Sequence, residues 1–177
     1  MRGIEACPEP VEGGEPGNSK LSAHWGVRMQ VRELLDGSSR EVLQVPHSVT
    51  LADAVQLMFE RKSTAFIVVD GEEPLGIFTE GDLLRCCAQH QVDAFARLPI
   101  SQAMTNKLIV AKPEDDLLAA FSMMIQTNIR HLPVVDGPAI VAILHLHEVA
   151  RHLVSALNEE LNYLQDYIAK HLDAVKD

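Results

Sequence analysis

Apolar residues recur along residues 51–59 at the spacing of one helical face. Positions 51, 54, 55, 58 and 59 are apolar, a series that predicts an amphipathic helix because these positions lie on one side of a 3.6-residue turn. Thr50 and Asp53 stand where a capping box would begin this helix. An extended segment over residues 43–45 is expected before it.

A β-hairpin is predicted after this helix. Residues 66–69 and 75–78 are two short apolar runs separated by an Asp70-Gly71 turn, which is the pattern of paired strands. A second helix is expected over residues 81–87. The predicted order is therefore strand, helix, strand, strand, helix.

The same order occurs twice, 66 residues apart. Residues 43–87 (the first repeat) align with residues 109–153 (the second repeat) without a gap, and nine positions are identical. These are Leu51/Leu117, Ala54/Ala120, Met58/Met124, Val68/Val134, Val69/Val135, Asp70/Asp136, Gly71/Gly137, Ile77/Ile143 and Arg85/Arg151. Asp116 would cap the first helix of the second repeat. Two copies are too few for a solenoid, so the pattern predicts two small α/β units related by a pseudo-twofold axis.

The chain is expected to divide into five parts. They are a disordered N-terminal extension (1–28), a first unit (29–90), a linker (91–99), a second unit (100–154) and a C-terminal amphipathic helix (155–177). Disorder is expected because residues 7–20 are rich in Gly and Pro and lack apolar periodicity. Residues 31–35 resemble residues 100–104, and each is expected to form one helical turn before the first strand of its unit.

The predicted C-terminal helix carries an incomplete heptad pattern. Leu157, Leu161, Leu164, Ile168 and Val175 fall near one seam, and His171 interrupts it. Two interpretations stay open. The helix packs back on its own chain, or two such helices from different copies make a dimer contact.

Charge narrows the possible partners. The chain has 25 acidic and 15 basic side chains, a formal charge of −10. This argues against nucleic acid, which is bound by basic residues, and against an anionic membrane surface.

The sequence also bears on where the protein acts. No apolar run approaches the roughly 20 residues of a membrane helix. Three cysteines, with Cys86 and Cys87 adjacent, do not suggest a disulfide framework. Cytoplasmic localisation is therefore expected.

The residues resemble the CBS-domain pair, or Bateman module. The likeness covers about residues 29–153 and depends on the duplication, on the run Pro133-Val134-Val135-Asp136 and on residues 76–82, which read Gly-Ile-Phe-Thr-Glu-Gly-Asp. The last run matches the family's G-h-x-[S/T]-x-x-D nucleotide motif at every defined position.

This resemblance implies a regulatory module and not an enzyme. CBS pairs bind adenosine-containing ligands (AMP, ADP, ATP, S-adenosylmethionine or NAD) in the clefts between their two units, without a metal. They also form disc-like homodimers. Because the sequence shows no output domain, the implied signal would act on a separate, unidentified protein.

The chemistry of the motif suits such a ligand. Gly76 would let backbone and ligand approach closely, the Thr79 hydroxyl would bind a phosphate or ribose oxygen, and the Asp82 carboxylate would accept bonds from the ribose hydroxyls. Thr79 and Asp82 also have the spacing of a capping box, and the two roles are compatible.

The resemblance supplies the remaining site residues. Thr64, Ala65 and Phe66 at the entry to the hairpin, with Gln44 and Val45 of the first strand, would flank the adenine. Arg130 and His131 from the second repeat would face the phosphates, since both side chains carry suitable donors.

The second repeat departs from the motif. Ala142, His145 and Glu148 replace the glycine, threonine and aspartate, so this cleft is expected to be degraded and each chain to hold one good site. An alternative function is a scaffold that binds no nucleotide. A further one is a metal-dependent hydrolase using His145, His147 and a carboxylate, although zinc would need three or four converging ligands.

Overall fold

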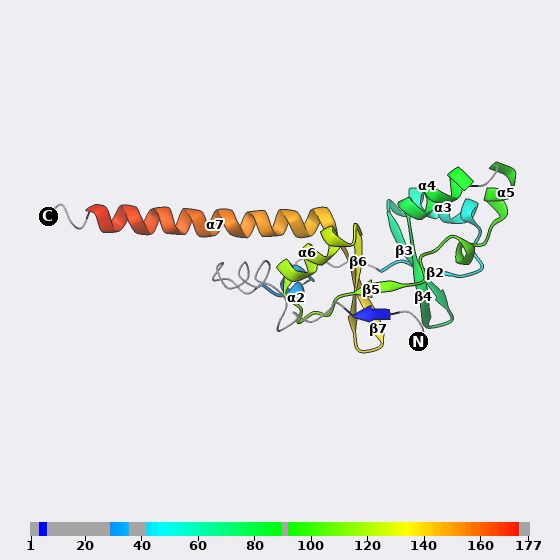
Figure 1. Ribbon diagram of the computed structural model, residues 1–177, viewed down its shortest axis with the longest axis horizontal. Helices are drawn as coiled ribbons and strands as arrows, with labels where there is room; N and C mark the ends of the chain where they lie inside the picture. Colours follow the sequence, from blue (N-terminus) through cyan, green and yellow to red (C-terminus); the bar gives the residue numbers. More distant parts are fainter. Residues whose placement is uncertain (1–3, 7–28, 36–41, 90–91, 174–177) are drawn as a thin grey trace.

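The computed structural model describes residues 4–6, 29–35, 42–89 and 92–173. Its strands are β1 (Ile4–Ala6), β2 (Gln44–Pro46), β3 (Ala65–Asp70), β4 (Glu73–Thr79), β5 (Leu108–Val110), β6 (His131–Asp136) and β7 (Ala139–His145). Its helices are α2 (Val31–Leu35), α3 (Leu51–Arg61), α4 (Glu80–Gln89), α5 (Val92–Arg97), the 3₁₀ turn η1 (Ile100–Gln102), α6 (Leu117–Gln126) and α7 (Leu146–Asp173). The fold is α/β, as predicted, with the two repeats side by side (Figure 1).

The two hairpins have the same register at the 66-residue offset. In β3–β4 the pairs run from Ala65↔Thr79 to Asp70↔Glu73, and in β6–β7 from His131↔His145 to Asp136↔Ala139. Each ladder shifts register at the equivalent place, after Val68 and after Val134. The duplication predicted from the sequence is therefore confirmed down to the bulge.

Equivalent turns close the two hairpins. Gly71 and Gly137 have φ of +60° and +59°, the left-handed conformation that a type II′ turn gives to the first loop residue. Nothing lies within 4 Å of a Cβ built on either glycine. Glycine is thus required here by backbone conformation and not by lack of space.

Outside the hairpins, the second repeat has one strand pairing that the first repeat lacks, between β5 and β1. β2 pairs with β3 in parallel, whereas β5 pairs in parallel with β1. Ala111, just after β5, exchanges backbone hydrogen bonds with Pro133 and Val135 of β6, both 2.9 Å. The prediction of disorder throughout residues 1–28 thus fails at Ile4–Ala6, because the open edge of β5 provides backbone partners. The rest of that extension lies outside the described residues.

Both predicted helix caps are present, but the apolar faces are only partly buried. The Thr50 hydroxyl accepts a hydrogen bond from Asp53 N (3.2 Å), and the Asp116 carboxylate accepts one from Ala119 N (2.8 Å). Leu51, Ala54 and Met58 enter the core, whereas Phe59 is 81% exposed. Because only these three residues of α3 are buried, its buried stripe is narrower than the predicted face.

Each short helical turn packs on the opposite repeat. Val31 of α2 lies in the core of the second repeat, and its backbone N donates to Asp115 O (3.0 Å). Ile100 of η1 lies in the core of the first repeat, and its N donates to Val49 O (2.7 Å). The exchange ties the repeats together, so residues 29–90 and 100–154 are not separate bodies in space. The predicted linker also contains helix α5.

A third cluster of buried side chains joins the two hairpins. It combines Ile67 and Ile77 of the first hairpin, Leu108 and Val110 of β5, and Ile143 of the second hairpin. These apolar contacts hold the two repeats face to face and fix the space between them.

The predicted last helix of the second repeat and the predicted C-terminal helix are one element. The α7 helix runs without a break from Leu146 to Asp173 and extends well beyond the rest of the protein (Figure 1). In the part of the chain that the structure describes, no helix is long and apolar enough to cross a membrane.

Candidate functional site

Asp82 lies at the centre of a buried hydrogen-bond network. It is 3% exposed, and its Oδ2 accepts from Thr79 N (2.9 Å) and Thr79 Oγ1 (2.8 Å). Its Oδ1 accepts from Thr105 Oγ1 (3.0 Å) and from the Arg85 guanidinium. Thr79 is the residue before α4, so the reciprocal Thr79–Asp82 pair is the capping box whose spacing the sequence shows.

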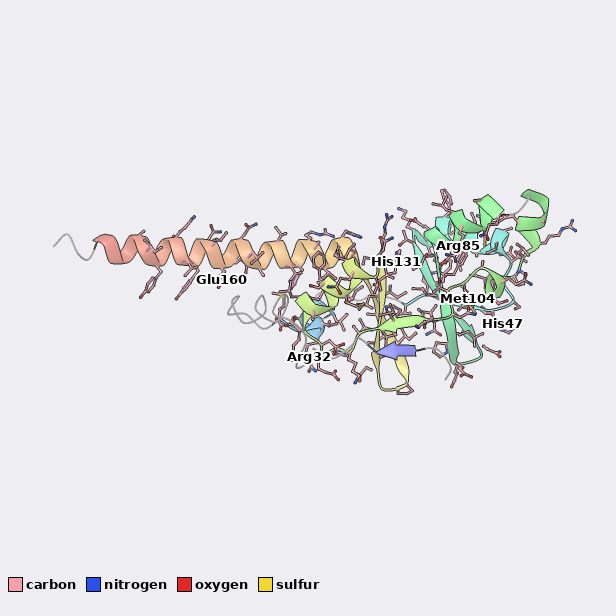
Figure 2. All side chains as sticks on the ribbon, viewed as in Figure 1. Arg32, His47, Arg85, Met104, His131 and Glu160 are labelled. Atoms are coloured by element: carbon pink, nitrogen blue, oxygen red, sulfur yellow. The ribbon has the colours of Figure 1, made fainter. Side chains whose placement is uncertain are left out.

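Arg85 extends this network to the segment after η1. Arg85 is labelled in Figure 2. Its guanidinium is half exposed and also donates to Ala103 O (3.3 Å). Asp82 therefore links the start of α4 to residues 103–105. Both of its oxygens are engaged by groups of the chain itself.

Gly76 faces protein backbone. A Cβ at this position would lie 2.5 Å from Thr105 O and 3.1 Å from Met104 Sδ. Ile77 and Thr105 exchange backbone hydrogen bonds of 3.0 and 2.8 Å beside it. The close approach expected from this glycine exists, but Thr105 occupies the space that the sequence analysis assigns to a ligand.

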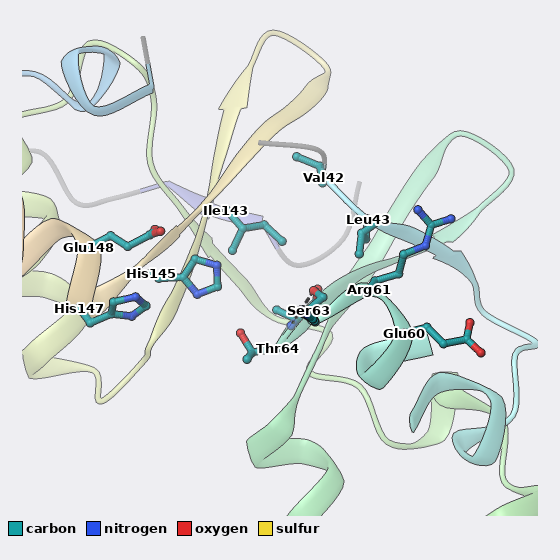
Figure 3. A pocket seen from close by; sticks show the side chains of 12 residues that line it. Val42, Leu43, Glu60, Arg61, Ser63, Thr64, Ile143, His145, His147 and Glu148 are labelled. Carbon is teal, nitrogen blue, oxygen red and sulfur yellow. Dashed lines mark hydrogen bonds between the residues drawn. The ribbon is translucent and has the colours of Figure 1, made fainter. Parts of the chain in front are cut away.

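A cavity between the two repeats lies at the second motif, the one with Ala142, His145 and Glu148. It has a volume of about 620 Å³, within the range of small-molecule sites. Its wall, shown in Figure 3, consists of Val42, Leu43, Glu60, Arg61, Lys62, Ser63, Thr64 and Ala65 from the first repeat side and Ile143, His145, His147 and Glu148 from the second. Thr64 and Ala65 thus face the altered residues His145 and Glu148.

The other predicted contacts are distributed over several environments. Phe66 and Val45 are core residues of the first repeat, so their side chains do not line the cavity. Gln44 is exposed on β2, and Arg130 is exposed just before β6. His131 is half-buried, and its Nε2 shares a 2.8 Å hydrogen bond with Thr64 Oγ1 that joins the two repeats.

The comparisons with known proteins identify the repeated unit. The family model of the CBS domain matches residues 31–89 and 100–155. The chain belongs to the CBS-domain family. A curated relative, the CBS domain-containing protein CBSX3, mitochondrial, of Arabidopsis thaliana, is 33% identical over 123 residues, 67% of this chain and 60% of its own length. The chain therefore spans less than two thirds of that relative.

Solved structures have the same CBS-pair architecture. ATU1752 from Agrobacterium tumefaciens is 28% identical, with a TM-score of 0.66 over 72% of this chain and 95% of that one. The CBS domain pair of protein MJ0100, in complex with 5-methylthioadenosine and S-adenosyl-L-methionine, is 21% identical, with a TM-score of 0.62 over 73% of this chain and 99% of that one. The predicted pair of CBS units is confirmed.

His131 lies among other imidazoles at the junction of the two CBS domains. Its ring centroid is 4.9 Å from that of His145, which is 5.7 Å from that of His147. Burial, with repulsion from His145, Arg130 and His147 and only partial compensation by Asp82, lowers the pKa of His131 from 6.5 to about 4. His131 is therefore neutral at pH 7 and brings hydrogen-bonding capacity, but no charge, to the junction.

This histidine should make the stability of the CBS pair depend on pH. Between pH 6.5 and pH 4 the unfolded chain protonates His131 while the folded chain does not, so stability falls as the pH falls. We expect a loss of about 2 kcal/mol in the free energy of unfolding between pH 7 and pH 4.5. Urea denaturation of wild type, His131→Gln and the control His152→Gln measures it. Equal pH slopes for wild type and His131→Gln would contradict the assignment.

The sequence led us to expect a degraded cleft at the second CBS motif, yet this motif lines the cavity. Most of the other residues of the cavity wall were not predicted. Glu60, Arg61 and Lys62 were not candidates, although they close α3 immediately before the predicted Thr64. The sequence held one usable signal: Lys62 aligns with Asn128, and asparagine is a residue type that tolerates left-handed backbone. Both adopt left-handed backbone, with φ of 50° and 54°, and so turn the chain from helix into the hairpin.

Within the described ranges, no three His, Cys, Asp or Glu side chains gather as a metal site would require.

Proposed function

We propose that this chain is a regulatory CBS pair that binds an adenosine-containing nucleotide between its two CBS domains and signals to a separate protein. The observation that carries the proposal is the 620 Å³ cavity formed jointly by the two repeats. A ligand there touches both domains at once, so its occupancy can change how they are held together. The role is regulatory, and no catalytic step is assigned to it.

The side chains around the cavity suit the parts of such a ligand. Glu148, at the position of the motif aspartate, would accept hydrogen bonds from ribose hydroxyls. Arg61 and Lys62 would attract phosphate oxygens or, for S-adenosylmethionine, its carboxylate. Leu43 and Ile143 offer apolar contacts to the base. The ligands bound by the MJ0100 pair, which shares only the fold, support this ligand class.

Thermal unfolding of the full chain with AMP, ADP, ATP, S-adenosylmethionine and NAD tests the proposal. A ligand at 100 times its dissociation constant adds about 2.7 kcal/mol, which raises the Tm by roughly 5–10 °C for a chain of this size. Glu148→Gln should remove most of the shift, because a neutral amide accepts weaker hydrogen bonds than a carboxylate.

Glu114→Gln is the matched control, since Glu114 is an exposed glutamate outside the cavity wall. It should keep the full shift. No Tm shift with any of the five ligands would argue against nucleotide binding.

A scaffold that binds no nucleotide is the second candidate, and the Asp82 network favours it. For a nucleotide to use Gly76, Thr79 and Asp82, its ribose hydroxyls would have to displace Thr105 and Arg85 from the carboxylate. The scaffold alone predicts that the apo and ligand-treated chains unfold at the same temperature. For either candidate we expect a homodimer, as the CBS family implies, and a cytoplasmic location, as the cysteine content suggests.

A further inference from the structure

The outer part of α7 carries an uncovered apolar stripe. We define the α7 seam as Val154, Leu157, Leu161, Leu164 and Ile168. Four of these side chains, all except Leu157, are between 47% and 57% exposed. The α7 helix projects away from the body of the protein (Figure 1). The alternative that the C-terminal helix packs back on its own chain is therefore not what the structure shows.

The α7 seam has the composition of a two-stranded coiled coil. Its residues are spaced 3, 4, 3 and 4 apart, the alternation of heptad positions a and d. Val154, Leu161 and Ile168 fall at a, and Leu157 and Leu164 fall at d. β-Branched side chains at a with leucine at d favour parallel dimers, and two of the three a positions are β-branched.

The flanking residues place the negative charge away from the seam. Glu159 and Asp166 occupy f positions, on the side of the helix opposite the seam. In a parallel pair Glu160, at g, meets the neutral Gln165, at e, of the second copy, so no like charges are opposed. An acidic outer face also disfavours an anionic membrane as the occupant.

We propose that two copies of this chain pair in parallel through the α7 seam. The same stripe on a second copy is complementary by twofold symmetry. The α7 seam extends over a stretch of 15 residues, 154–168, which spans roughly 21 Å of helix. A projecting helix of this length is marginal in water alone. Pairing supplies the apolar contacts that the body of the protein does not provide.

Oxidative cross-linking of the full chain carrying Leu157→Cys tests the pairing. In the parallel dimer the two introduced thiols meet at a d layer and should form a disulfide, identified by peptide mass spectrometry. In an antiparallel pair they would lie roughly 15 Å apart, beyond the reach of a disulfide. Adding Leu161→Glu should abolish the cross-link.

Tyr163→Glu is the matched control, because Tyr163 is an exposed apolar residue of α7 outside the seam. Added to Leu157→Cys, it should leave the cross-link unchanged, and neither glutamate should alter the Tm of the body. Absence of the cross-link, or its survival with Leu161→Glu, would overturn the proposal. These results do not depend on nucleotide binding, so they are independent of the proposed ligand function.

Discussion

Asp82→Ala is expected to lower the free energy of unfolding of the ligand-free chain by about 3 kcal/mol, or roughly 10 °C in Tm. The substitution removes the acceptor for Thr79 N, Thr79 Oγ1, Thr105 Oγ1 and the Arg85 guanidinium. The Thr79 donors are half-buried, so leaving them without an acceptor carries part of their desolvation cost, and hydrogen bonds to a charged acceptor are the stronger kind. The helix cap of α4 is lost as well, which itself costs about 1 kcal/mol. Urea denaturation of the ligand-free protein measures the loss.

Asp53→Ala is the matched control. Asp53 forms the same kind of capping box with Thr50 at the start of α3, but on the exposed surface. Its loss should cost no more than about 1 kcal/mol. If Asp82→Ala proves as mild as Asp53→Ala, the carboxylate is not the structural link that its four hydrogen bonds indicate.

Gly76→Ala is expected to cost about 2 kcal/mol in the absence of any ligand. The added methyl carbon would lie 2.5 Å from Thr105 O. Because this oxygen belongs to the backbone and accepts a hydrogen bond from Ile77 N, the two segments must separate. Thermal unfolding of the ligand-free variant measures the effect.

Gly81→Ala separates a steric effect from a general response to losing glycine. A Cβ at Gly81 would meet only Thr79 Oγ1, at 3.6 Å. Alanine is also the better helix former by about 1 kcal/mol, so this variant should be neutral or slightly stabilised. A Gly76→Ala chain with wild-type Tm and impaired nucleotide binding would instead restore Gly76 to the role of ligand cradle.

Much of the fold follows from periodicity and duplication. The 66-residue offset predicted both hairpins, and the bulges after Val68 and Val134 repeat it. Thr50 and Asp116 cap their helices as expected. These features are local, because hydrophobic spacing and turn residues act over a few positions.

The features that sequence could not supply are those that connect distant segments. Thr105 binds Asp82 across 23 residues, and no local pattern in the sequence marks it as the partner. Val31 packs with the second repeat although it adjoins the first. The cavity also depends on contacts between distant segments, because residues of both repeats form its wall. It therefore lies at the second motif, which was expected to be degraded.

Titration calorimetry of the full chain tests the central claim most directly, with the ligand that gives the largest thermal shift. The account predicts one nucleotide per chain, an affinity at least about tenfold weaker for Glu148→Gln, and little change for Asp82→Asn. No binding heat with any of the five ligands would contradict it. So would binding that Asp82→Asn abolishes while Glu148→Gln leaves it intact, since the nucleotide would then occupy the first motif and not the cavity between the CBS domains.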